Sequence, residues 1–238
     1  MSTINLLYHD SYSINDSIHI VIPTVGQILD NEDEYYNLVS ALTAMPIDMM
    51  VQLDDAHIDF TQINAYELFL LLFKGIREQN TSLIFGDLDL SKFTIHENPQ
   101  NGTLTLYDKV NDIRIDRAVH AQIAATLRKI HHLKKNRRKP ANKEAKDYML
   151  ERARIKLKRH RDRKEDSQLE SLIIALVNTE QFKYDFDGTR ELSIYQFNES
   201  VRQIMKKIDY DNRMYGIYTG TLNPKDFSQD DLNWLTRK

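Results

Sequence analysis

The order of hydrophobic and polar positions in the first part of the chain predicts a strand followed by a helix. Residues Ser17–Ile22 alternate and are rich in Ile, and they end at Pro23, which is typical of a short strand. Residues Val25–Leu29 are interpreted as a loop or turn. The acidic cluster Asp30–Glu34 then precedes apolar residues at helical spacing over Tyr35–Met45, and acids favour the N-terminal end of a helix.

Two further helices and a small sheet are predicted before residue 116. Pro46 ends the preceding helix, Ile47–Gln52 forms a short one, and Ala65–Glu78 forms a helix so apolar that we expect it to be buried centrally. After Gly86 the hydrophobic period changes to two. Short alternating segments separated by turn-like sequences predict an antiparallel meander with the strands Phe93–Ile95, Thr103–Tyr107 and Ile113–Ile115.

The second half of the chain has only helical periods. Asp116 is positioned to cap a helix over Arg117–Leu133. A new helix begins at Asn142, with an apolar stripe formed by Ala145, Met149, Leu150, Ala153 and Leu157. Residues 158–168 contain no aliphatic or aromatic side chain, so they form either a solvent-bridging helix or a flexible linker.

Apolar spacing resumes over Leu169–Val177, is interrupted at Phe182–Thr189, and returns over Ile194–Ile208. The chain ends in an aromatic, glycine-punctuated tail from Tyr215 to Leu235. We therefore predict an α+β fold, mostly helical, with a small antiparallel β-meander in the N-terminal half and a helical C-terminal half.

The formal net charge of -3 conceals three segments of different sign. Residues 1–127 carry 6 basic and 18 acidic side chains, residues 128–164 carry 17 and 4, and residues 165–238 carry 9 and 13. Together with the periods, this predicts an acidic α+β domain at 1–133, a basic linker or long helix at 134–168, and a helical region at 169–238.

Several classes of protein are disfavoured by composition. The chain has no cysteine, so it has no disulfide and no thiolate site, which suits a reducing cytosol. Residues Met1–Asp16 lack the pattern of a signal peptide. The longest apolar run, Leu68–Phe73, is far shorter than the roughly 20 residues that span a bilayer, so no membrane association is expected.

The sequence offers no catalytic, cofactor or metal site that outweighs a structural explanation. Two glycine-rich patterns are typical of phosphate binding, G-x-x-x-x-G-K-S/T and G-x-G-x-x-G, and neither occurs in this sequence. Asp54–Asp59 contains metal-ligand residue types but no second set of ligands, so an exposed acidic turn is favoured. Asp185–Gly188 begins like a calcium loop but lacks the later ligands, so a capped turn is favoured. We therefore predict no enzyme activity, no cofactor and no metal.

The histidines do not form an evident catalytic set either. Neighbouring positions on a helix face different sides, so His131 and His132 are not expected to share a ligand. His120 is interpreted as a partly buried or surface histidine and not as a general base.

The basic segment carries the strongest physical signal. It could bind nucleic acid by releasing counterions from phosphate, or it could pair with the acidic domain, contact another protein or remain solvated. Few aromatic residues accompany its charges, which favours protein contact or solvation over a single-strand reader. The candidate basic patch comprises Lys134, Lys135, Arg137, Arg138, Lys139, Arg152, Arg159, Arg161 and Arg163.

The order of these segments resembles a known family, the tail assembly chaperones of long-tailed, siphovirus-like phages of Gram-positive hosts. The N-terminal segments that carry the resemblance are Ile22–Leu29, Glu34–Pro46, Val51–Asp55, Ile58–Phe60, Glu67–Phe73 and Ile113–Asp116. The C-terminal segments are Phe197–Val201, Gly216–Thr221 and Leu232–Leu235. None of these patterns is catalytic.

The resemblance implies a non-enzymatic factor in the host cytoplasm that is not retained in the mature virion. It would bind the tape measure protein through residues 1–133 and recruit the major tail tube protein through the region from 169. Self-association into a homo-oligomer stays open. A nucleic-acid-binding regulatory module acting through residues 134–164 is the alternative.

The candidate partner-binding residues follow from the needs of such a chaperone. Tape measure proteins are long amphipathic helices, so an apolar or methionine-rich groove is needed to shield their stripes. Met45, Met49 and Met50 are candidates for that groove, and core packing is the alternative explanation for them. In the closing segment the candidates are Tyr215, Tyr218 and Trp234.

Overall fold

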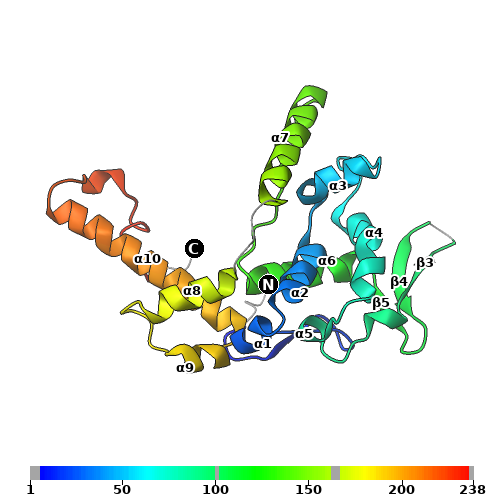
Figure 1. Ribbon diagram of the computed structural model, residues 1–238, viewed down its shortest axis with the longest axis horizontal. Coiled ribbons are helices and arrows are strands. Elements are labelled where there is room, and N and C mark those ends of the chain that lie inside the picture. Colours follow the sequence, from blue (N-terminus) through cyan, green and yellow to red (C-terminus); the bar gives the residue numbers. More distant parts are fainter. Residues whose placement is uncertain (1–5, 100–101, 162–166, 236–238) are drawn as a thin grey trace.

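The computed structural model describes residues 6–99, 102–161 and 167–235, and it confirms an α+β fold in which helices dominate (Figure 1). The strands are β1 (Ser11–Ser13), β2 (His19–Val21), β3 (Thr94–Glu97), β4 (Leu104–Asp108) and β5 (Ile113–Ile115). The α-helices are α1 (Val25–Leu29), α2 (Glu32–Thr43), α3 (Met50–Asp55), α4 (Ala65–Arg77), α5 (Ser82–Phe85), α6 (Arg117–Ile130), α7 (Lys143–Arg161), α8 (Gln168–Val177), α9 (Phe186–Glu191) and α10 (Ile194–Tyr218). The 3₁₀ turns are η1 (Pro46–Met49), η2 (Leu90–Lys92) and η3 (Pro224–Asp226).

Three helices, α2, α4 and α6, pack against one another to form the main core. Leu38 of α2, Phe69 of α4 and Leu127 of α6 are each at most 2% exposed. Burial of such side chains is the main driving force for folding. The apolar helix α4 therefore lies in the core, as its composition predicts.

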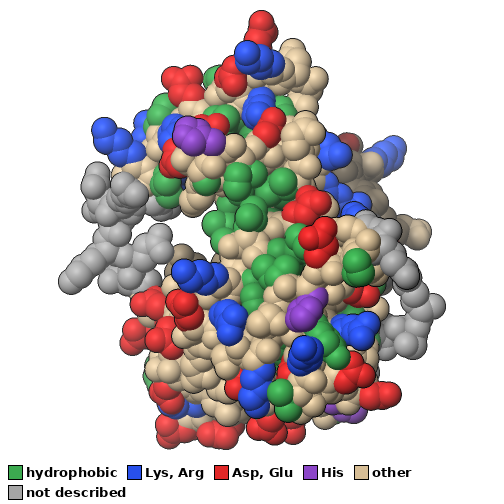
Figure 2. Space-filling model, turned by 90° about the vertical axis from the view of Figure 1, so that its right-hand side faces the viewer, with side chains coloured by type: hydrophobic (Ala, Val, Ile, Leu, Met, Phe, Trp, Pro, Cys, Tyr) green, Lys and Arg blue, Asp and Glu red, His purple; other side chains and the backbone are tan. Residues whose placement is uncertain are grey.

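The predicted meander is present as the antiparallel sheet β3-β4-β5, and a second sheet pairs β1 with β2. Leu106 and Ile115 face each other in the meander and are fully buried. Ile95, which pairs with Leu106 from β3, and Leu104, near the turn between β3 and β4, are exposed. Figure 2 views the side of the molecule that carries α3, α4 and this sheet. It shows hydrophobic side chains gathered in a band at mid-height, with charged side chains above and below.

The C-terminal helices share their core with the N-terminal elements. Ile173 of α8 and Phe197 of α10 belong to the same buried cluster as Leu38 and Phe69. The backbone adds a direct link, because the Val25 amide donates to the Leu192 carbonyl oxygen at 2.9 Å and the Ile194 amide donates to that of Pro23 at 2.8 Å. The regions predicted at 1–133 and 169–238 therefore share one core. The division into three segments stays a prediction about which segment binds which partner.

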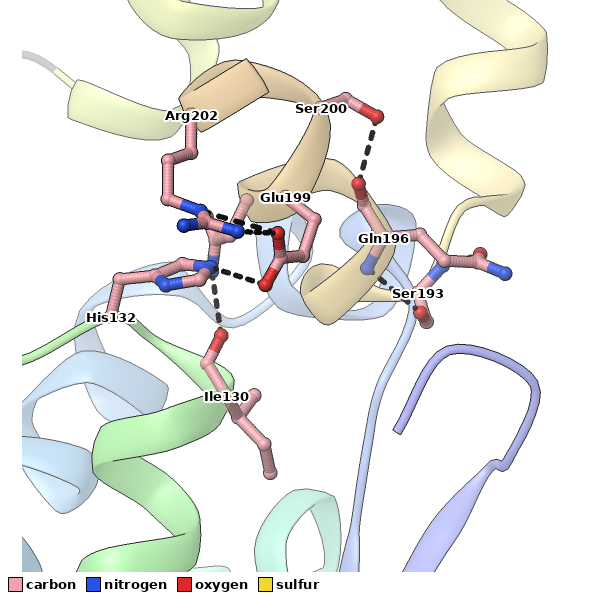
Figure 3. Close-up of polar contacts among 8 residues, drawn as sticks. Ile130, His132, Ser193, Gln196, Glu199, Ser200 and Arg202 are labelled. Carbon is pink, nitrogen blue, oxygen red and sulfur yellow. Dashed lines mark hydrogen bonds and ion pairs between the residues drawn. The ribbon is translucent and has the colours of Figure 1, made fainter. Parts of the chain in front are cut away.

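A polar junction joins the end of α6 to α10 (Figure 3). The side-chain amide of Asn198 donates to the Ile130 carbonyl oxygen at 3.1 Å, which satisfies a carbonyl at the open end of α6. His132 follows with a left-handed backbone (φ 53°), a conformation common just after a helix end. Its Nε2 lies 3.7 Å from the Glu199 carboxylate, which also accepts from Arg202 at 2.6 Å.

Two long helices project from this body (Figure 1). α7 packs against α3 as far as Arg154, and residues 155–159 beyond it are exposed. The far half of α10 is also largely exposed, and the terminal segment returns along it, where Gln203 donates to the Trp234 carbonyl oxygen at 2.9 Å. Within the described ranges, no helix is long and apolar enough to cross a membrane.

Three local predictions are corrected. Val25–Leu29 is a helix and not a loop, because Thr24 and Gln27 form a reciprocal capping box at its start. Gly188 lies within α9, which Asp185 caps, so the expected capped turn continues as a helix. α10 extends to Tyr218, so the first residues of the expected tail are helical.

The interval at 158–168 is only partly described. Helix α7 continues to residue 161 and α8 begins at 168, while residues 162–166 lie outside the described ranges. Residues 158–161 of the interval are therefore helical.

Candidate functional site

A cavity of about 910 Å³ opens between η1, the loop at 59–65, α6, the irregular segment 135–140 and the start of α7. We refer to it as the cavity. Its volume falls at the upper end of the range of roughly 300–1,000 Å³ that is typical of ligand-binding clefts. The apolar part of its lining consists of Met45, Pro46, Ile47, Phe60, Ile63, Ala65, Tyr66, Ala121, Ala124 and Pro140.

One face of α6 forms a wall of the cavity. Arg117, His120, Ala121, Ala124 and Arg128 all line it, and their spacing of three, four, seven and eleven positions from the first places them on a single helical face. The two alanines leave room in the middle of this wall. The charged ends of the face are held differently, since Arg128 donates to the Thr43 carbonyl oxygen whereas Arg117 is exposed.

Cations without ion-pair partners surround the opening. We define the basic rim as Arg117, Lys135, Arg137, Arg138, Lys139 and Lys143, which line the cavity and form no ion pair within the described part of the chain. The acidic side chains in the lining are Asp59 and Asp147. Because Asn136 donates to the Asp48 carboxylate at 2.7 Å, the segment that carries most of the rim is attached to η1.

An ion pair links the loop at 59–65 to α7. Lys146 Nζ lies 2.8 Å from the Asp59 carboxylate and 5.6 Å from the centre of the Phe60 ring. Asp59 also accepts from the amide and the hydroxyl of Thr61 at 2.9 and 2.7 Å. The hydrogen bond from Lys146, followed by those from Thr61, lowers the pKa of Asp59 to about 2.

This ion pair gives a direct test of the geometry. In Lys146→Met, the pKa of Asp59 should rise from about 2 toward the ordinary value of about 3.9, because its principal charged donor is lost. The titration of the Asp59 carboxyl carbon can be followed by NMR. Lys143→Met removes a neighbouring cation that has no such contact and should leave the Asp59 titration in place. An unchanged pKa in Lys146→Met would show that the loop and α7 are not joined in this way.

His120 is the only buried side chain in the described part of the chain whose polar atom, Nε2, has no hydrogen-bond partner. It is 3% exposed, and its ring stacks on Phe69 with centroids 4.4 Å apart. Burial lowers the pKa of His120 to about 4, against the effect of a backbone hydrogen bond at Leu42. The ring is therefore neutral at pH 7, and since a backbone carbonyl takes its one N–H, Nε2 offers a lone pair.

The basic helix α7 is partly neutralised by the acidic end of α3. Arg154 lies 2.7 Å from the Asp54 carboxylate and 2.6 Å from that of Asp55. This is the intramolecular pairing considered as an alternative to nucleic-acid binding. Intramolecular ion pairs thus neutralise Arg154 and, through Asp59, Lys146. Lys156, Lys158 and Arg159 remain exposed without an ion pair in the described ranges.

The predicted site residues do not gather in one place. The cavity is lined by Met45, Lys135, Arg137, Arg138 and Lys139. Met49 and Met50 instead pack beside Leu53 and Phe60 in a second buried cluster. Lys134 is exposed beside the cavity, and Arg152 and Arg159 are exposed on α7. Arg161 ends α7 but its side chain is not described, and Arg163 lies outside the described residues.

The C-terminal candidates lie elsewhere, on and against α10. Tyr215 and Tyr218 are 73% and 81% exposed near its end. Trp234 is half-buried, with the Lys207 ammonium 5.6 Å from its ring centre. Among the described residues, no group of three or more metal-ligating side chains is placed to hold a metal ion.

Residues that line the cavity but were not singled out from sequence include Phe60, Ile63 and Tyr66. His120, which was expected to be partly buried or at the surface, is instead buried in the lining. Phe60, Ile63 and Tyr66 carry no sequence signal of a binding site, because they line a cavity only where α7 approaches them. The face of α6 does carry one, since small side chains flanked by two arginines at helical spacing indicate a face that is open to something other than the core.

Comparison with known proteins gives a match over the C-terminal part of the chain. Residues 161–237 match a family model described as the YomV second domain. Neither a curated protein nor a solved structure matches the chain. The matched region begins at the last residue of α7 and includes α8, α9 and α10. The match makes residues 161–237 similar to this domain and is consistent with a phage origin.

Proposed function

We propose that the protein is a non-enzymatic assembly chaperone of phage tails. In this proposal it binds the tape measure protein and recruits the major tail tube protein in the host cytoplasm, then leaves before the virion is complete. The support comes from the YomV-like C-terminal region, the resemblance of the segment order to tail assembly chaperones, and the open apolar cavity in the N-terminal half.

The observation that carries the proposal is the apolar lining of the cavity. A client that is a long amphipathic helix needs its apolar stripe covered until assembly, and a groove lined by aliphatic and aromatic side chains is the usual receptor for such a stripe. Met45, Ile47 and Ile63 provide that kind of surface. Residues 1–133 supply most of this apolar surface and would hold the client here, while residues 135–147 form another wall of the cavity.

The exposed end of α10 is the candidate surface for the tube protein. Tyr215, Tyr218 and Met205 are each more than 60% exposed on a helix that projects from the body. Tyrosine and methionine are enriched in protein–protein interfaces. Because this surface lies far along the projecting helix, one chain would be able to hold two partners.

The proposal predicts that the intact protein keeps a co-expressed tape measure fragment soluble. Ala121→Trp, which fills the cavity from an exposed position on α6, should abolish this effect. Ala125→Trp makes the same change at an exposed position of the same helix outside the lining and should retain it. The measurement is the soluble fraction of the fragment and its co-purification. A fragment that stays insoluble and unbound with the unaltered protein contradicts the proposal.

The exposed cations of α7 favour one alternative, a nucleic-acid-binding module. In that case duplex or single-stranded oligonucleotides should bind at low salt and dissociate steeply as salt rises, and Arg137→Glu, Arg138→Glu and Arg159→Glu together should abolish binding. Absence of binding at low salt would eliminate this alternative.

A further inference from the structure

We infer that the cavity receives an acidic amphipathic segment of a partner protein. The apolar residues of the segment would lie on the apolar floor of the cavity, which we define as Ile47, Phe60 and Ile63, and its carboxylates would lie against the basic rim. The inference rests on the proposed use of the cavity as a partner site, although not on which protein the partner is. It specifies the chemistry of the segment that fits.

Charge complementarity is the first argument. The six cations of the basic rim come from α6, from the segment 135–139 and from the start of α7, so they approach the opening from three parts of the chain. Of the two acids in the lining, Asp59 is already paired with Lys146. The opening therefore attracts negative charge, and it repels the basic helices that would otherwise suit an apolar floor.

The apolar floor argues against a simple anion. Ile47, Phe60 and Ile63 present no donor to a phosphate, and a cavity of about 910 Å³ is far larger than such an ion. Arginine-bordered apolar grooves suit helices that alternate apolar and acidic residues, because each side chain then meets a surface of its own kind.

The floor also argues against nucleic acid. Single strands are held by stacking of bases on open aromatic faces. Here the Phe60 ring is 5% exposed with Lys146 over it, and Tyr66 is 7% exposed with its hydroxyl donating to the Ile115 carbonyl oxygen at 2.7 Å. Neither ring is free to stack on a base.

His120 supplies an independent indication that the cavity has an occupant. It belongs to the lining and is 97% buried, yet its Nε2 lone pair has no partner in the described part of the chain. A buried acceptor without a donor is rare in folded proteins. A hydroxyl or amide of the bound segment would complete it.

The test uses the full chain and fluorescein-labelled helical peptides of about 18 residues, roughly five turns. One peptide carries a leucine stripe flanked by glutamates, the second has lysines in place of the glutamates, and the third keeps the glutamates but has a serine stripe. Fluorescence anisotropy at physiological salt should show binding of the first peptide and at least about tenfold weaker binding of the other two. Equal binding of the lysine peptide would overturn the inference.

Variants locate the site. Arg137→Glu, Arg138→Glu and Lys139→Glu together should weaken binding of the acidic peptide at least about tenfold. Lys156→Glu, Lys158→Glu and Arg159→Glu make the same charge change on the part of α7 outside the cavity and should leave the affinity unchanged. His120→Phe should weaken binding by about three- to tenfold through loss of the acceptor. Equal losses in both triple variants would overturn the inference.

Two competitors identify other occupants. An oligothymidine strand or inorganic phosphate that displaced the acidic peptide at equal or lower concentration would overturn the inference in favour of an anion site. Failure of the tape measure co-expression with peptide binding intact would remove the chaperone proposal alone. Rescue of the tape measure fragment without any preference for the acidic peptide would remove this inference alone.

Discussion

Replacing Phe197 with alanine should lower the free energy of unfolding of the whole chain by about 3–5 kcal/mol. Phe197 is 0% exposed on α10, and it belongs to the buried cluster that also contains Phe69 of α4. Truncating a phenylalanine in such a core removes its transfer free energy and leaves a cavity that neighbours fill only partly. The loss should therefore be felt by helices that lie far away in the sequence.

Urea unfolding followed by circular dichroism gives the stability, and amide hydrogen exchange of α4 shows whether the N-terminal core is affected. In Phe197→Ala, the most protected amides of α4 should exchange faster in proportion to the loss of stability. Met205→Ala, on the same helix but 62% exposed, should change the stability by less than about 0.5 kcal/mol. Protection of α4 that survived the Phe197 change would show that residues 169–235 fold independently of the N-terminal half.

The helices with long apolar periods and the meander could be predicted because their periods reflect the face that each element buries. Helix α1 could not, since five residues are too short to show a period and its definition comes from the capping pair Thr24 and Gln27. The far half of α10 was missed for another reason. Polar pairs such as Lys207 with Asp211 and Asp209 with Arg213 dominate this part of the helix. Its apolar residues Tyr210, Met214 and Ile217 run into the glycine-punctuated segment that was interpreted as a tail.

The candidate site was predictable only in part. Its basic rim was visible as a charge run, and Met45 was singled out beside Pro46. The cavity itself depends on contacts that join distant positions, Asp48 with Asn136 and Asp59 with Lys146. No local pattern encodes these pairs. The run of cations at 134–139 therefore predicted the positive charge of the site. It did not predict that an apolar surface lies beside these cations.

Mild acid should destabilise the protein through its buried histidines, and His120 should contribute most. Burial lowers the pKa of His120 to about 4, whereas the unfolded chain protonates the ring near 6.5. Above pH 6.5 the ring is neutral in both states and its contribution is fully present. As the pH falls below 6.5, only the unfolded state binds the proton, so about 1.4 kcal/mol is lost per pH unit down to about pH 4. The total is about 3 kcal/mol for this ring.

His131 should act in the same direction. Its Nε2 lies 2.8 Å from the Tyr35 hydroxyl, and burial lowers its pKa to about 4 as well. Because this side chain is less buried than His120, we expect a smaller contribution from it. Burial also lowers the pKa of His132, against the attraction of Glu199.

Urea unfolding between pH 7 and pH 4.5 measures how the free energy of unfolding depends on pH. The variant His120→Phe separates the contribution of His120 from that of the other histidines. The phenyl ring cannot bind a proton, so the variant should lose about half of the pH dependence in this window. At pH 7 two effects of about 1–3 kcal/mol each oppose one another in this variant, because the unpaired acceptor is removed and the Leu42 carbonyl oxygen loses its donor. His96→Gln is the control, since His96 is exposed on β3 and loses little hydration on folding. A variant that gained stability at pH 7 but bound the acidic peptide more weakly would show that the orphaned nitrogen of His120 is maintained for the partner and at the expense of the fold.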